Sequence, residues 1–210
     1  MSDAVKGETI TKLDLAKREL SQAIYLFLED KDPVTYYQLA FTSHEIIRNI
    51  ANAKGIKSIL KDDSVDMINE EGLDTVLEKR YGEKYKSIKK KDLKEKIKIF
   101  MNYDYNNIKH SGSNADEEVT IHWDVAQIVM VDSIEMLRRL GESLSSEHIA
   151  LMLWTKKRAP EVYNGTNMTK ALEYFEENID KVDKDNLLRF VGDFKKAGLE
   201  DLLNLTKASK

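Results

Sequence analysis

The main candidates for acid–base or binding chemistry lie in one short stretch, residues 104–110, with the sequence DYNNIKH. His110 stands where a helical pattern gives way to a polar loop, and such junctions often present reactive or binding side chains on rigid elements. Its imidazole titrates near neutral pH and could act as a general acid or base. The alternative is that His110 only caps the helix, because a cation in the last turn interacts favourably with the helix dipole.

A second polar group lies on an earlier predicted helix. One edge of its apolar stripe carries Tyr37, Phe41, His44 and Arg48, with Glu45 beside them. At the margin of an apolar face, we expect His44 to be a partly buried, hydrogen-bonded residue rather than a functional one. Asp104 lies within the apolar stripe of its own helix and needs a basic or N–H partner. We expect an ion pair with Arg48 or another cation, with a binding role as the alternative.

Several kinds of site are excluded or disfavoured by the residues that are missing. The chain has no cysteine, which excludes disulfides, thiolate metal sites and cysteine nucleophiles. The zinc-protease spacing HExxH fails because the second histidine position after His44 holds Arg48. Glycine-rich phosphate loops and the GxSxG nucleophile motif are absent as well. We therefore expect no metal and no cofactor.

Composition and charge favour a helical protein that is not a general nucleic-acid binder. Only 2 prolines and 9 glycines occur in 210 residues, which favours long helices over a turn-rich β architecture. The net charge of -4 means that RNA binding would need a local basic patch. We expect the lysines of residues 86–98 to be the solvated face of a helix, with a phosphate-binding strip as the alternative. His122 and His148 are expected at the surface or at helix starts.

The positions of apolar residues predict the elements that hold these groups. Repeats at three- and four-residue steps predict helices over residues 11–29, 33–54, 122–140, 146–158, 168–179, 185–197 and 199–205, with a lysine-rich helix that leads into His110. A four-residue linker makes the first two helices an antiparallel hairpin. The helix over 122–140 is apolar on two sides, so it is either central to the bundle or shared with a second copy. Residues 1–145 form the predicted main bundle, and residues 146–210 a C-terminal helical subdomain packed on it.

No stretch of the sequence has the properties of a membrane segment. The N-terminal residues lack the basic start and apolar core of a secretory signal, and no apolar run is long enough to span a bilayer. We therefore expect a cytoplasmic protein with no membrane partner.

The order of the helices, with Asn106, Lys109 and His110 before a polar loop and an apolar helix, resembles the HEPN (higher eukaryote and prokaryote nucleotide-binding) superfamily over residues 8–141. The resemblance implies a dimeric helical bundle, often tied to toxin–antitoxin, phage-defence or RNA-processing systems. Catalytic members are metal-independent ribonucleases that use Arg-polar-x-x-x-His at the dimer interface. Here the family histidine falls on His110 and its polar residue on Asn106, but the arginine position holds Tyr105. Tyrosine carries no charge with which to stabilise a phosphate in the transition state.

The sequence therefore predicts an all-α, HEPN-like antiparallel helical bundle with a C-terminal helical extension. We expect a homodimer through the helix around residues 125–136. The leading hypothesis is a non-catalytic binding module for a nucleotide, RNA or a partner protein, with ligand contacts from Asn106, Lys109, His44, Glu45 and Tyr105. One alternative is a divergent metal-independent ribonuclease with a catalytic set of His110, Arg48 and Asp104. The other is a purely structural or regulatory helical protein.

Overall fold

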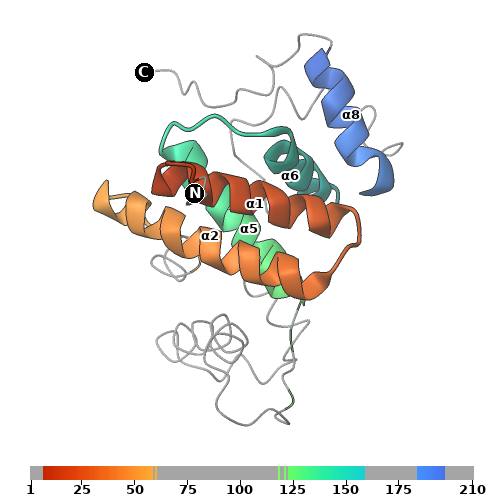
Figure 1. Cartoon of the computed structure of the whole chain (residues 1–210). Helices are drawn as coiled ribbons and strands as arrows, with labels where there is room; N and C mark the ends of the chain where they lie inside the picture. Colours follow the sequence, from red (N-terminus) through yellow and green to blue (C-terminus); the bar gives the residue numbers. More distant parts are fainter. Residues whose placement is uncertain are drawn as a thin grey trace, which may run out of the picture.

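The computed structural model describes residues 7–58, 60, 118, 121, 123–158 and 184–196, and every regular element among them is an α-helix (Figure 1). The prediction of an all-α fold is confirmed for this part of the chain. In chain order the helices are α1 (Lys12–Leu28), α2 (Pro33–Ala53), α5 (Trp123–Arg139), α6 (Ser146–Arg158) and α8 (Lys184–Lys196). The helices expected over residues 168–179 and 199–205, the lysine-rich helix and His122 lie outside the described residues.

The first two helices form the antiparallel hairpin that the sequence predicts. The hydroxyl of Thr11 accepts a hydrogen bond of 3.0 Å from the backbone N–H of Asp14 and so caps α1. The Asp32 carboxylate accepts from two N–H groups at the start of α2, and Pro33 fits the first helical turn. After α2, Gly55 adopts a φ of 75°, a left-handed conformation that glycine reaches without strain. The predicted ends of both helices are therefore right to within one residue.

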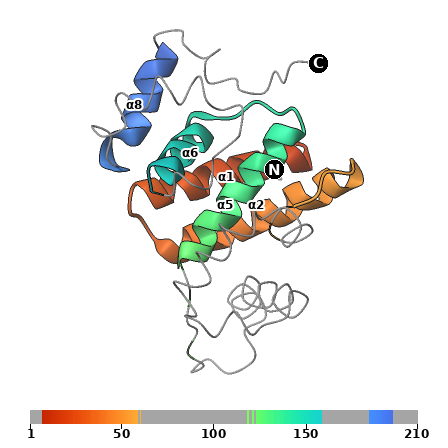
Figure 2. The same cartoon turned by 180° about the vertical axis from the view of Figure 1, so that it is seen from behind.

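Helix α5 lies across the back of this hairpin and runs in the same direction as α2 (Figure 2). Its first residue, Trp123, contacts the ring of Tyr36 near the start of α2, with ring centroids 6.2 Å apart. At its other end, the Arg139 guanidinium donates a hydrogen bond of 2.9 Å to the carbonyl of Lys57, just beyond α2. The antiparallel arrangement thus holds for α1 and α2, while α2 and α5 are parallel.

Most residues on the two apolar sides of α5 are buried within the chain itself. Val129 and Leu137 on one side are inaccessible to solvent, and Val125 and Met136 on the other are buried as well. Ile128, in contrast, is largely exposed. This arrangement fits the first of the two predicted alternatives, a central helix; the homodimer stays a prediction.

Helices α6 and α8 extend the bundle on the far side of α1. Helix α6 packs on α1, and α8 packs on both of them. The ammonium of Lys184 in α8 pairs with the Asp30 carboxylate and lies 4.4 Å from the centre of the Phe27 ring. One apolar cluster spans all the described helices, with Ala16, Leu20, Ala23, Ile24, Phe41, Ile47, Met130, Ile134, Leu137, Leu151 and Leu187 among its members. The domain boundary at residue 145 stays a prediction, and none of the described helices is both long and apolar enough to cross a bilayer.

Candidate functional site

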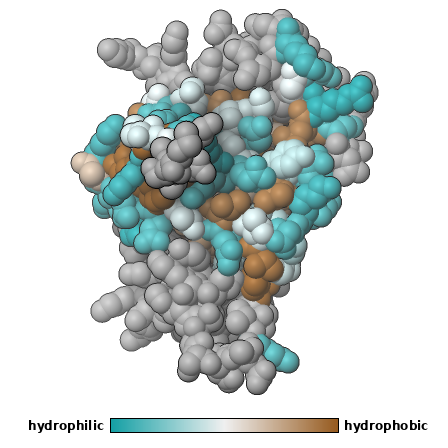
Figure 3. Space-filling view, viewed as in Figure 1, coloured by the Kyte–Doolittle hydropathy of each residue, from teal (hydrophilic) through white to brown (hydrophobic). Residues whose placement is uncertain are grey.

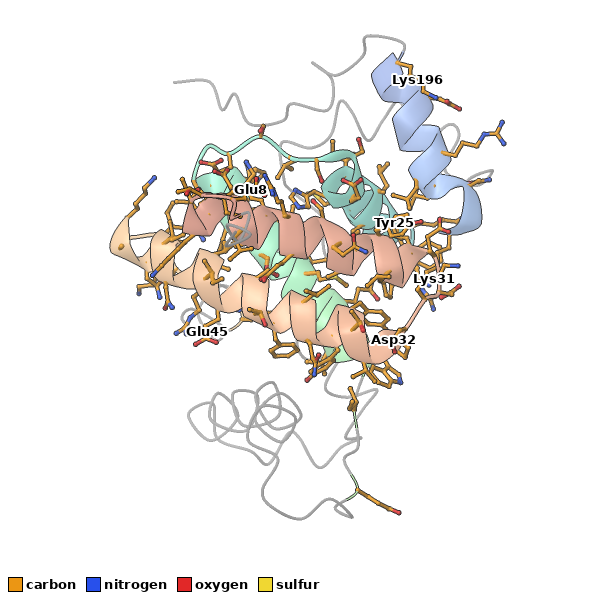
Figure 4. All side chains as sticks on the ribbon, viewed as in Figure 1. Glu8, Tyr25, Lys31, Asp32, Glu45 and Lys196 are labelled. Atoms are coloured by element: carbon orange, nitrogen blue, oxygen red, sulfur yellow. The ribbon has the colours of Figure 1, made fainter. Side chains whose placement is uncertain are left out.

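The structure describes three of the eight residues that the sequence nominates for a site. Asp104, Tyr105, Asn106, Lys109 and His110 lie outside the described residues. On α2, His44 is completely buried, Arg48 is half-buried and Glu45 is exposed. Glu45 projects from the outer side of α2 (Figure 4). Because neighbouring helical residues point about 100° apart, His44 and Glu45 face the core and the solvent respectively, and the structure does not bring them together.

His44 belongs to a buried polar cluster that joins three segments of the chain. Its Nε2 lies 2.7 Å from Oδ2 of Asp132 on α5, and the hydroxyl of Ser58 donates a hydrogen bond of 2.6 Å to the same oxygen. The side chains of His44 and Asp132 are 0% and 3% exposed. A buried carboxylate needs such donors, and this one receives two of them. The hydrogen bond that the sequence predicts for His44 is present, but the side chain is fully buried and not partly buried.

This cluster holds segments of the chain against each other rather than binding a substrate. Together with the bond from Arg139 to the Lys57 carbonyl, it fixes the segment after α2 against α5 at two points. Nδ1 of His44 has no hydrogen-bond partner within the described part of the chain. However, His44 is completely buried and Asp132 is almost completely buried, so neither side chain is placed to bind a molecule in solution in this conformation.

His148 forms a second buried cluster at the start of α6. Its Nδ1 lies 3.2 Å from the backbone nitrogen of Ser145, which donates, and the Ser145 hydroxyl lies 3.4 Å from the backbone nitrogen of His148. This is a capping box in which histidine replaces the usual Glu or Gln. Since Nδ1 accepts, the ring proton sits on Nε2, 3.3 Å from the hydroxyl of Ser21. The Ser21 hydroxyl is in turn 3.0 Å from that of Ser145.

This tautomer excludes a serine–histidine nucleophile pair in the observed geometry. A general base would need an unprotonated Nε2 facing Ser21 and an Nδ1–H held by an acceptor. The opposite arrangement is present. Burial, and then the charge of Lys17, lower the pKa of His148 to about 4. Of the two expected positions for His148, the helix start is right and the surface is wrong, because its side chain turns back to cap α6.

The Ser21, Ser145 and His148 cluster lies at the edge of a hollow of about 630 Å³ between α1 and the start of α6. Lys17, Arg18, Gln22 and Tyr25 line it from α1, and Ser143, Leu144 and Glu147 line it from the other side. Lys17 forms an ion pair of 2.9 Å with Glu142. Arg18 makes two parallel hydrogen bonds to the carboxylate of Glu8, of 2.8 and 3.0 Å, and these bonds lower the pKa of Glu8. The hollow thus has a mixed polar and apolar lining, with side chains of both charges.

Sequence reasoning missed the residues that complete both clusters. Asp132 lies within an apolar stripe of its helix, in line with Val125 and Met136, which is the same kind of signal that singled out Asp104. The pattern Ser145-x-x-His148 matches the capping-box spacing, so this bond could also have been predicted. Nothing local in the sequence points to Ser21 or Ser58, because their partners lie more than 70 residues away.

No group of histidine, aspartate and glutamate able to hold a metal ion occurs in the part of the chain that the structure describes. Comparison with known proteins adds no relative: no family model, no curated protein and no solved structure matches the chain. The HEPN resemblance therefore stays a prediction.

Proposed function

We propose that this protein is a HEPN-like, non-catalytic binding module for a nucleotide, RNA or a partner protein, with residues 102–118 as part of the binding surface. The observation that carries the non-catalytic part is the missing arginine of the motif, whose position holds Tyr105, and the state of the two described histidines adds to it. Both His44 and His148 are 0% exposed, and each is engaged by hydrogen bonds inside the protein. Neither can exchange a proton with a bound substrate in this geometry.

Among the three ligand classes, we favour a nucleotide or short RNA. On the face shown in Figure 3, apolar residues of the described part alternate with polar ones. The exposed large apolar residues of the described helices include Leu15, Tyr25, Val34, Trp123 and Ile128. Single exposed apolar residues of this kind are ordinary, whereas a large continuous apolar patch would favour a protein interface.

The test combines cleavage and binding on the same purified protein. RNA cleavage is measured without divalent metal for the wild type and for the His110→Ala and Arg48→Ala variants. Thermal unfolding is measured in parallel with mononucleotides and with single-stranded oligoribonucleotides, because a ligand that binds only the folded state raises the unfolding temperature. We expect no cleavage and a concentration-dependent rise in the unfolding temperature.

Two results would contradict this expectation in different ways. Cleavage that disappears in both variants would make the protein a divergent ribonuclease in which Arg48 replaces the family arginine. No cleavage and no stabilisation by any nucleotide or RNA would leave the partner-protein class, which co-purification with a tagged chain examines, or the purely structural alternative if no partner is recovered.

A further inference from the structure

The hollow beside α1 holds a feature that the clusters at His44 and His148 do not explain. Arg18 lines the hollow, and its guanidinium makes two parallel hydrogen bonds of 2.8 and 3.0 Å to the carboxylate of Glu8. Carboxylates and phosphates bind arginine in this paired geometry. Glu8 therefore shows that an oxyanion fits against the guanidinium of Arg18, a residue that lines the hollow.

The bond between Arg18 and Glu8 is also easy to exchange. The two side chains are 60% and 63% exposed, and exposed ion pairs contribute little to stability. A dissolved oxyanion can therefore take the place of Glu8 without disturbing the core. Lys17 lines the same hollow one residue earlier, and its ammonium has three donors, of which Glu142 uses one. A second cation is thus available to the same oxyanion.

The residues after Arg18 on the same side of α1 provide contacts for a larger molecule. Gln22 follows one turn later and Tyr25 two turns later, and both line the hollow. Figure 4 shows Glu8 near the first half of α1 and Tyr25 toward its C-terminal end. The tyrosine is 41% exposed, so part of its side chain is accessible to a planar group. Bases stack on aromatic side chains of this kind.

We propose that this hollow binds a nucleoside monophosphate, with the phosphate on Arg18 and Lys17 in place of Glu8, the ribose beside Gln22 and the base against Tyr25. Seven helical residues separate Arg18 from Tyr25, which corresponds to about 10 Å along α1. That spacing suits a phosphate and a base joined by a ribose, and it is too long for an aromatic acid whose carboxylate is attached directly to its ring.

Glu147 adds a restriction on the ligand. It lines the hollow on the side of α6, and its charge opposes further phosphate groups. The hollow therefore favours monophosphates over triphosphates. This inference rests on the proposed function for the nucleotide class, but it assigns the nucleotide to residues other than 102–118.

Calorimetric titration of the full chain with AMP at low ionic strength tests the site. We expect saturable binding that Arg18→Ala weakens at least tenfold, because a bidentate bond between charged groups is lost. Tyr25→Ala is expected to weaken it about tenfold through lost stacking. Glu8→Gln removes the competing charge and is expected to strengthen binding severalfold. As a matched control, Arg189→Ala on α8, where the side chain is 86% exposed, is expected to leave the affinity unchanged.

Three outcomes overturn the inference. The first is an absence of saturable AMP binding by the wild type. The second is AMP binding that Arg18→Ala and Tyr25→Ala leave unchanged; a nucleotide would then bind elsewhere, and the proposed function would survive without this site. The third is equal affinity for AMP and inorganic phosphate, which would make the hollow a simple anion site. If AMP fails to bind while an oligoribonucleotide binds, the proposed function stands and only this inference fails.

Discussion

The substitution His148→Gln is expected to remove a specific part of the acid sensitivity of this protein. In the folded chain, Nδ1 of His148 accepts from the N–H of Ser145, and the side chain is fully buried. Protonation would place an N–H donor against that N–H group and a charge in the interior. Burial and the nearby Lys17 accordingly lower the pKa of His148 from 6.5 to about 4.

Because folding lowers the pKa of His148, this residue makes the folded chain less stable in acid. A base whose pKa is lower in the folded state binds its proton more readily when the chain is unfolded. The corresponding stability is fully present above about pH 6.5 and is lost as the pH falls toward about 4. At about 1.36 kcal/mol per unit of pKa, the complete loss is on the order of 3 kcal/mol.

Glutamine is the informative replacement because it keeps the cap without the titration. Its side-chain oxygen can accept from the Ser145 N–H as in an ordinary capping box. We expect the wild type and His148→Gln to have similar free energies of unfolding near pH 7.5, and the variant to be the more stable by about 2 kcal/mol near pH 4.5. Urea unfolding followed by circular dichroism at several pH values measures this difference.

A second variant, His148→Ala, distinguishes the contribution of the helix cap from that of the histidine titration. His148→Ala removes both, so it is expected to be less stable than the wild type near neutral pH by about 1 kcal/mol or more. Its stability should then fall less steeply in acid. Carboxylates elsewhere titrate equally in all three proteins and cancel in the comparison. Parallel pH profiles for the wild type and the glutamine variant would refute the buried, neutral histidine.

Three further predictions concern stability and use the same unfolding assay. Asp132→Ala is expected to lower the free energy of unfolding by about 3 kcal/mol, because it removes the acceptor that His44 and Ser58 share. Glu135→Ala replaces a half-buried acid on the same helix and should change stability by only about 0.5 kcal/mol. Equal effects of the two substitutions would contradict the role of the buried cluster. Burial raises the pKa of Glu19, which means that its ionised form destabilises the folded chain. Glu19→Gln is therefore expected to raise the unfolding temperature at neutral pH, and this gain should shrink as the pH falls through the pKa of Glu19. A gain that persists in acid would have another origin. Gly141→Ala is expected to lower the free energy of unfolding by about 1 kcal/mol, because the φ of Gly141 is 80°. Gly192→Ala within α8 should be neutral or stabilising, since the added Cβ meets nothing within 4 Å. The reverse order of stabilities would argue against a left-handed turn at Gly141.

The local parts of the fold could be predicted because their signals are local. Thr11, the Asp32-Pro33 pair, Gly55 and Gly141 mark helix ends by backbone chemistry, and the described helices begin and end within one or two residues of those marks. Apolar spacing also identified the buried faces of α1 and α5.

The polar clusters could not be predicted from local signals, because they depend on which helices meet. His44 and Asp132 are 88 residues apart in sequence, and Ser21 and His148 are 127 apart. Spacing showed that His44 lies at an apolar margin, but only the packing of α2 on α5 decides that it is fully enclosed and bonded to a carboxylate. The hollow depends likewise on the approach of α6 to α1. The predicted contacts of residues 104–110 lie outside the described residues and stay predictions.

The parallel course of α2 and α5 has a consequence for dividing this protein into parts. Since Trp123 lies near the start of α2 and Arg139 near its end, the chain must return along the length of α5, about 25 Å, between residues 58 and 123. An extended linker covers that distance with about eight residues. Replacing residues 61–117 with a glycine- and serine-rich linker of about twelve residues would remove every nominated residue of the 104–110 motif. It would remove none of the described residues that line the hollow or form the two buried clusters, and it would keep Leu60 and Ile121, which pack against the core. Such a shortened chain would let the ligand of the motif and the ligand of the hollow be assigned independently.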